Sequence, residues 1–153
     1  VLMVASEVEP YAKTGGLADV IGSLPQALRA RNLDVRVLLP RYSSIDAGKF
    51  PMRSLGRAAI EFDGAPVLAE FLEAENPHGQ VPTYFLEAPR YFRRAKFYGD
   101  GDDVMRFCFF SRAALELPQL LNWTPDVIHC HDWHTGLLPV YREKLTQSGA
   151  RPE

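Results

Sequence analysis

The chain has 153 residues, of which 46% are hydrophobic and 24% are charged, and its net charge is -2. This length is sufficient to bury a core, and the composition is ordinary for one globular domain. The charge excludes the basic footprint of a nucleic-acid-binding domain, and no stretch reaches the roughly 18 apolar residues of a membrane span. We therefore expect neither nucleic acid nor a membrane among its partners.

The opening of the chain predicts a strand, a helix and a second strand. Residues 1–5 are a continuous apolar run, which is typical of a parallel strand covered on both faces. Apolar residues recur at helical spacing through 17–28, where Pro25 predicts a kink or a restart capped by Ser23. Residues 34–40 form the second strand and complete a β-α-β unit.

The middle of the chain changes to short alternating runs, which are separated by turn signals such as Asp63-Gly64. This pattern predicts a β-hairpin excursion followed by a return to the sheet. The expected strands lie at 59–62, 67–72 and 83–86.

The last third predicts two helices around one strand. Asp102 is the expected N-cap of a helix that ends at Pro118, the next strand is 125–131, and a last helix covers 137–145. Strands that alternate with helices predict an α/β fold with a Rossmann-like parallel sheet and helices on both faces. The apolar stripe of the first of these helices consists of Val104, Phe107, Cys108, Ser111 and Leu115.

The loop after the first strand contains Lys13, Gly15 and Gly16 and is suited to an anion. The glycines let a ligand approach the backbone, the following helix directs its free N–H groups at the loop, and the lysine adds a charge. Neither standard glycine-rich phosphate fingerprint is present. The alternative is a tight strand-to-helix turn without a ligand, and the loop by itself leaves both open.

The segment His129-Cys130-His131-Asp132-Trp133-His134 holds enough ligand types for zinc to be considered. Along a strand, however, Cys130 points away from His129 and His131, so the ligand atoms diverge. We therefore expect no metal and no cofactor, and His129 and Cys130 are interpreted as packed core residues. Neither Cys130 nor Cys108 has the spacing of a redox pair, which favours a reduced, cytoplasmic protein.

Asp132, Trp133 and His134 stand where the chain leaves the sheet and are expected to project into a cleft. An aspartate can accept hydrogen bonds from sugar hydroxyls. Trp133 either stacks on a sugar face or packs. Because ligands of such sheets bind outside the carboxyl ends of the strands, both loops are expected to lie at one site.

Two motifs, K-T-G-G-L-A-D-V at 13–20 and H-D-W-H at 131–134, occur together with R-V-L-L-P at 36–40 and P-D-V-I-H at 125–129. With Tyr98, Arg106 and Phe107 between them, the chain resembles the N-terminal half of bacterial glycogen synthase and plant starch synthase. These are retaining glucosyltransferases of glycosyltransferase family 5. The resemblance covers about residues 1–146.

The resemblance implies a GT-B architecture, in which two Rossmann-like domains face a cleft and glucose passes from ADP-glucose to the nonreducing end of an α-1,4-glucan. UDP-glucose stays open as the donor, because the absent half reads the base. By this resemblance the donor-binding residues are Lys13, Gly15 and Gly16, the catalytic residues are Asp132 and His134, and the residues that line the cleft or meet glucan are Asp19, Tyr98 and Trp133.

The resemblance also implies a missing remainder. We expect residues 1–153 to form a single, truncated N-terminal domain without the C-terminal nucleotide-binding domain, and therefore to be inactive alone. The unfinished sheet edge favours self-association. The alternative is a noncatalytic glucan-binding or assembly module with the same fold.

Overall fold

The computed structural model describes residues 1–94 and 96–149. Its strands are β1 (Leu2–Val4), β2 (Arg36–Pro40), β3 (Met52–Phe62), β4 (Ala65–Ala74), β5 (Thr83–Glu87) and β6 (Ile128–Cys130). Its α-helices are α1 (Gly16–Arg29), α2 (Pro89–Phe92), α3 (Asp103–Ala113), α4 (Leu117–Leu120) and α5 (Leu138–Gln147). Three short 3-10 turns are η1 (His78–Gln80), η2 (Ala114–Glu116) and η3 (Trp133–Thr135).

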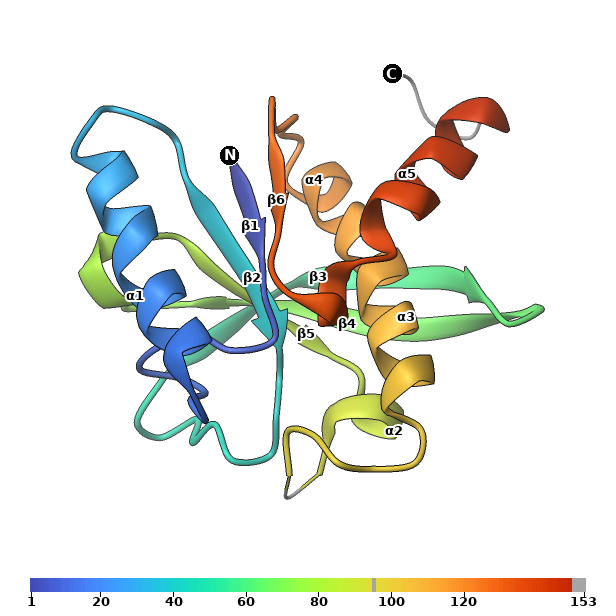
Figure 1. The fold of residues 1–153 in the computed structure, drawn as a ribbon, viewed down its shortest axis with the longest axis horizontal. Helices are drawn as coiled ribbons and strands as arrows, with labels where there is room; N and C mark the ends of the chain where they lie inside the picture. The colour runs from blue at the N-terminus through green and yellow to red at the C-terminus, as the bar shows by residue number, and fades with distance from the viewer. Residues whose placement is uncertain (95, 150–153) are drawn as a thin grey trace.

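All six strands form one sheet in the order β3-β4-β5-β2-β1-β6 (Figure 1). Strands β5, β2, β1 and β6 are parallel, and β1 pairs on one side with β2 and on the other with β6. Helix α1 lies on one face of this parallel part, while α3 and α5 lie on the other (Figure 1). The predicted α/β fold with a Rossmann-like parallel region and helices on both faces is confirmed.

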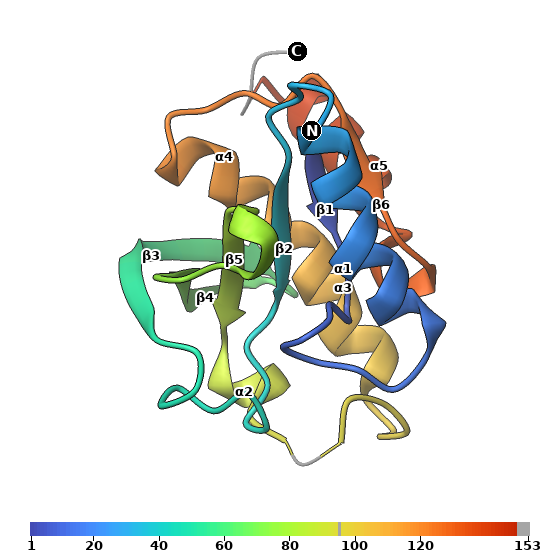
Figure 2. The same ribbon diagram turned by 90° about the vertical axis from the view of Figure 1, so that its left-hand side faces the viewer.

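The predicted hairpin is also confirmed, and it stays within the sheet. Strands β3 and β4 are antiparallel around Asp63-Gly64, whose φ angles of 53° and 78° suit a tight hairpin turn. Strand β4 then pairs antiparallel with β5, so the hairpin forms the end of the sheet opposite β6 (Figure 2). Strands β3 and β4 are both longer than expected. Cross-strand ion pairs on the solvent-facing side, such as Arg57 Nη2 with Glu70 Oε2 at 3.3 Å, stabilise the additional length.

Helix α1 runs through Pro25 as one element, so the expected restart is wrong. Ser23 does not cap a new helix, because its hydroxyl turns back and donates to the carbonyl oxygen of Asp19 at 2.7 Å. This local side-chain bond is the usual alternative to capping for a serine inside a helix.

Helix α3 begins after Asp102 as expected, but the Asp102 carboxylate pairs with Arg94 instead of capping the helix. The helix ends at Ala113, and Pro118 lies in the first turn of α4. The expectation that Pro118 ends the helix is therefore wrong. Proline is tolerated in a first turn, where its missing N–H has no helical partner.

The predicted stripe of this helix is confirmed for Phe107, Ser111 and Leu115, which are buried, but the buried face of α3 is broader than the stripe. Phe109 and Phe110 are fully buried, whereas Val104 is 71% exposed. Helical spacing alone does not predict the buried side of α3, because this helix is apolar on more than one side. The phenylalanines are buried because they lie on the side that packs against the sheet.

Strand β6 is the end strand of the described sheet, so its residues are less buried than the interpretation as packed core residues requires. His129 is exposed and Cys130 is half-buried, because only β1 pairs with β6. The observed strand covers only residues 128–130, fewer than the expected 125–131. Within residues 1–94 and 96–149, no helix has the length and apolar character needed to cross a membrane.

Gly22 provides a test of how α1 packs on the loop before it. A Cβ atom at this position would lie 2.9 Å from Glu9 Cβ and 3.1 Å from the Glu9 carbonyl oxygen. We expect Gly22→Ala to lower the free energy of unfolding by about 1–3 kcal/mol, despite the better helix propensity of alanine. Urea unfolding followed by circular dichroism measures this. The control is Gly16→Ala in the same helix, where no atom lies within 4 Å of the added carbon, and equal stability of the two variants would contradict the packing.

Candidate functional site

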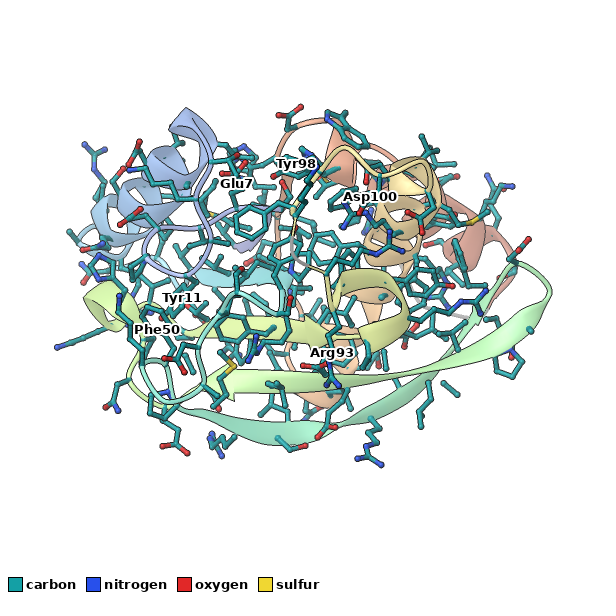
Figure 3. The ribbon with its side chains drawn as sticks, turned by 90° about the horizontal axis from the view of Figure 1, so that it is seen from below. Glu7, Tyr11, Phe50, Arg93, Tyr98 and Asp100 are labelled. Atoms are coloured by element: carbon teal, nitrogen blue, oxygen red, sulfur yellow. The ribbon has the colours of Figure 1, made fainter. Side chains whose placement is uncertain are left out.

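The loop after β1 and the turn after β6 lie at the same edge of the sheet, because neighbouring parallel strands end on the same side. The backbone N–H of His131 donates to the Val4 carbonyl oxygen at 3.1 Å and continues the ladder to this edge. A third segment, which carries Tyr98 and leads into α3, completes the site. Glu7 and Tyr98 lie side by side between α1 and α3 (Figure 3).

Glu7 joins these segments and is not among the site residues predicted from the sequence. Its side chain is buried, and one carboxylate oxygen accepts hydrogen bonds from the backbone N–H groups of Thr14 and Gly15, at 2.5 and 3.2 Å. The other oxygen accepts from the Thr14 hydroxyl and the Tyr98 hydroxyl, both at 2.7 Å. The carboxylate therefore connects the Lys13–Gly16 loop to Tyr98.

Two opposing effects act on the pKa of Glu7. Burial raises it, but the hydrogen bonds from Thr14, Tyr98 and Gly15 together lower it below its ordinary value. Glu7 is therefore ionised at neutral pH. Its contribution to stability is present above the ordinary carboxyl pKa and is lost as the pH falls through the lower folded-state pKa.

Lys13 is exposed and lies among carboxylates. Its Nζ is 2.5 Å from Asp19 Oδ1 and 3.5 Å from Glu9 Oε2. The hydrogen bond with Asp19, together with the charges of Asp19 and Glu9, raises the pKa of Lys13. The lysine is thus a cation whose charge is already balanced by Glu9 and by Asp19 in the first turn of α1.

Gly15 and Gly16 are exposed, and their local backbone does not require glycine. Gly15 has an extended φ of -152°, and nothing lies within 4 Å of a Cβ added at either position. The space above both residues is open, which permits a ligand to reach the backbone and disfavours a turn held together by packing. The Thr14 and Gly15 N–H groups, however, are already occupied by Glu7.

The turn after β6 holds Asp132 in a strained conformation. Its φ of 64° and ψ of 179° lie in a region that non-glycine residues rarely adopt and that costs about 1–3 kcal/mol. Asp132 Oδ1 accepts from the Trp133 backbone N–H at 2.6 Å, and the Thr135 hydroxyl donates to the His131 carbonyl oxygen at 3.0 Å. These bonds fix the turn and leave Asp132 exposed.

His134 does not project into a cleft as expected but is buried beneath aromatic rings. Its ring lies 4.5 Å from that of Tyr98, 4.6 Å from that of Phe107 and 4.0 Å from that of Trp133, measured between centroids. Burial lowers its pKa, although nearby Asp132 opposes this, so the imidazole is neutral at pH 7. Trp133 remains 53% exposed, so one side packs while the rest is free to meet a ligand.

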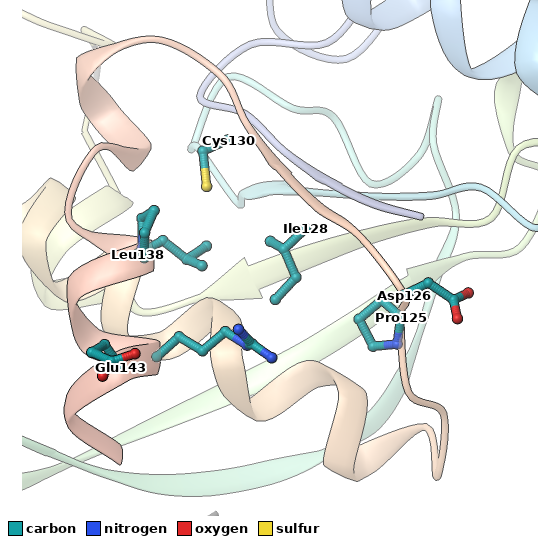
Figure 4. A pocket seen from close by; sticks show the side chains of 8 residues that line it. Pro125, Asp126, Ile128, Cys130, Leu138 and Glu143 are labelled. Carbon is teal, nitrogen blue, oxygen red and sulfur yellow. The ribbon is translucent and has the colours of Figure 1, made fainter. Parts of the chain in front are cut away.

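The side chains of β6 alternate as expected. The rings of His129 and His131 lie 3.9 Å apart, whereas Cys130 and Ile128 line a groove of about 350 Å³ between β6 and α5 (Figure 4). The expectation that His129 is a packed core residue is wrong, since the open edge of the sheet leaves it exposed. In the described part of the chain, the only three potential metal ligands within mutual reach are Asp100, Asp102 and Asp103, and Arg94 and Arg106 pair with them.

Comparison with known proteins shows to which family the chain belongs. Residues 1–151 match the family model of the starch synthase catalytic domain. The chain belongs to this family. It is 43% identical over 151 residues to glycogen synthase of Geotalea uraniireducens (strain Rf4), covering 94% of this chain and 31% of that protein. Glycogen synthase of Clostridium beijerinckii is 44% identical over 142 residues, covering 92% and 29%.

A solved structure has the same fold. It is the catalytic domain of starch synthase IV from Arabidopsis thaliana, bound to ADP and acarbose, and its architecture is GT-B-like. The similarity has a TM-score of 0.86 at 35% identity and covers 97% of this chain and 31% of that chain. The family resemblance seen in the sequence is confirmed, and the chain spans about a third of the length of these relatives.

His131 generates a prediction about pH. Burial, with a smaller effect from His129, lowers the pKa of His131 to about 4. The unfolded chain, with a histidine pKa near 6.5, binds more protons between these values, so stability is complete above pH 6.5 and falls as the pH approaches 4. We expect a loss of about 2 kcal/mol between pH 7 and 4.5 that is largely absent in His131→Phe.

Urea unfolding at a series of pH values measures this dependence. His78→Phe, at an exposed histidine away from the site, is the control and should keep the wild-type dependence. An unchanged pH dependence in His131→Phe would contradict the assignment.

Proposed function

We propose that this chain forms the N-terminal, sugar-facing part of a retaining glucosyltransferase that transfers glucose from ADP-glucose to the nonreducing end of an α-1,4-glucan. Family membership supports the reaction class. The Arabidopsis starch synthase IV structure, bound to ADP and acarbose, supports a nucleotide and an oligosaccharide as the ligands.

One observation carries the proposal: the contact series from Glu7 through Tyr98 to His134 joins the two loops at the sheet edge. The open Gly15-Gly16 backbone on one loop, and exposed Asp132 and Trp133 on the other, are therefore held at a single site. A sugar placed there meets the exposed Asp132 carboxylate and the partly exposed indole ring of Trp133.

The charges at this edge suit the sugar better than the diphosphate. Carboxylates accept hydrogen bonds from sugar hydroxyls and stabilise the positive charge that develops on the ring as the bond between glucose and the diphosphate breaks. In the proposed roles, exposed Asp132 meets the sugar, buried His134 supports the Tyr98 and Trp133 rings beside it, and Tyr98 and Asp19 line the cleft. Lys13 approaches the diphosphate after release from Asp19.

The balance of charges at this edge also supports a second domain. Lys13 already pairs with two carboxylates, those of Glu9 and Asp19, which outnumber its single ammonium group. Beside the loop the described residues add one further cation, Lys96, which lines a pocket with Thr14 and Tyr98, so stabilising a departing diphosphate calls for more cations than these two lysines. We accordingly propose a C-terminal nucleotide-binding domain as their source.

The second candidate is a noncatalytic glucan-binding or assembly module, in which the same exposed Trp133 and Asp132 would contact the glucan.

Two further properties are part of the proposal. The free thiols of Cys108 and Cys130 support a reducing, cytoplasmic location, and the unpaired side of β6 supports self-association of the chain.

The direct test is transfer of radiolabelled glucose from ADP-glucose to glycogen. We expect no transfer by the 153-residue chain, and transfer by a chimera in which residues 1–151 replace the matching segment of the Geotalea glycogen synthase. Asp132→Ala in the chimera should reduce kcat at least tenfold. Turnover by the chain alone would refute the need for a second domain. A folded chimera that binds glycogen without transfer would instead favour the noncatalytic module.

A second prediction concerns the open glycine backbone. Because space is reserved above Gly16, we expect Gly16→Ala in the chimera to lower kcat/KM for ADP-glucose about tenfold with little change in melting temperature. Gly22→Ala is the matched control and should show the reverse pattern, a lower melting temperature with unchanged KM. If Gly16→Ala keeps wild-type kinetics, the donor does not approach this backbone.

A further inference from the structure

We propose that Glu7 is a positioning residue, whose carboxylate holds the Lys13–Gly16 loop and the Tyr98 side chain in one fixed relation through hydrogen-bond geometry. The inference rests on the proposed function, since the relation matters for the reaction only if both elements meet the same substrates.

The contacts of Glu7 exclude a direct chemical role. Its two oxygens accept four hydrogen bonds, two from backbone N–H groups and two from hydroxyl groups, and its side chain is almost completely buried. A carboxylate offers about four lone-pair positions, and here all of them are used. Glu7 has no free position with which to accept a substrate proton or attack a sugar.

Glu7 does not act as a counter-ion either. The nearby cation, Lys13, pairs with Asp19 and Glu9. The donors that Glu7 meets are neutral, so what they require is an acceptor in a defined position.

The restraint extends to the second loop through Tyr98. The Tyr98 hydroxyl also lies 2.8 Å from Ser6 Oγ, and its ring packs against the buried His134 ring, which in turn packs on Trp133. Loss of the Glu7 carboxylate therefore frees the glycine loop and removes a partner that fixes the ring covering His134.

The substitution Glu7→Gln separates the effect of hydrogen-bond geometry from the effect of the negative charge. In Glu7→Gln the amide oxygen can accept from the Thr14 and Gly15 N–H groups, while the amide nitrogen donates to the Thr14 and Tyr98 hydroxyls. Hydroxyl groups both donate and accept, so all four contacts can persist without the negative charge. In Glu7→Ala all four are lost.

The first experiment measures kinetics in the chimera with Geotalea glycogen synthase. We expect Glu7→Ala to lower kcat at least tenfold, and Glu7→Gln to stay within about threefold of wild type. Tyr98→Phe removes one of the four bonds and should fall between them. Its matched control is Tyr42→Phe, which removes a buried hydroxyl bond to the Ser6 carbonyl oxygen, 3.0 Å long, without touching Glu7, and should leave kcat unchanged.

The second experiment measures amide hydrogen exchange of Thr14 and Gly15 by NMR in the 153-residue chain, with circular dichroism as a check on folding. Protection should be lost in Glu7→Ala and retained in Glu7→Gln. Unchanged protection in Glu7→Ala would show that Glu7 does not hold the loop and would overturn the inference.

The kinetic outcomes are equally decisive. If Glu7→Gln is as damaging as Glu7→Ala, charge and not geometry is required, and the inference fails. It also fails if Glu7→Ala keeps full kcat. If the wild-type chimera transfers no glucose, the proposed function fails instead, and the exchange measurement alone decides whether Glu7 positions the loop.

Discussion

The pairing of β1 with both β2 and β6 is the constraint on which the site depends. This strand has only three residues, all fully buried, and it is held by parallel ladders on both sides. Because parallel neighbours end at the same edge, the pairing brings together residues separated by more than a hundred positions in the sequence. Glu7 and the turn at Asp132 are therefore adjacent as a consequence of backbone pairing, before any side chain contributes.

Much of this arrangement is predictable from local patterns. The continuous apolar runs of β1 and β2, the Asp63-Gly64 turn and the alternation along β6 each depend on neighbours in the sequence, and each is observed. The position of the two loops at one edge follows from the topology of alternating strands and helices. Some failures, such as the burial of Phe109 and Phe110 in α3 and the exposure of the end strand, occur where a nonlocal partner decides.

The candidate site likewise contains some residues that local sequence predicts and others that depend on distant partners. Lys13, Gly15, Gly16 and Asp132 are recognisable by residue type and spacing, and all four are exposed at the predicted edge. Glu7 was missed because its significance lies in contacts with Thr14 and with Tyr98, 91 positions away. A glutamate that follows an apolar strand gives no local sign of being buried. The burial of His134 likewise depends on Tyr98 and Phe107, which no spacing rule connects to it.

The open Gly15-Gly16 backbone and the occupied Thr14 and Gly15 N–H groups impose different requirements on a ligand. A phosphate bound by the loop in the usual way would need those N–H groups and would compete with a buried, ionised carboxylate. Displacing Glu7 would leave its charge without hydrogen bonds in a buried position, which is costly. The loop is therefore better suited to a neutral sugar than to a phosphate, and under the proposed function the diphosphate would lie on the outer side of Lys13.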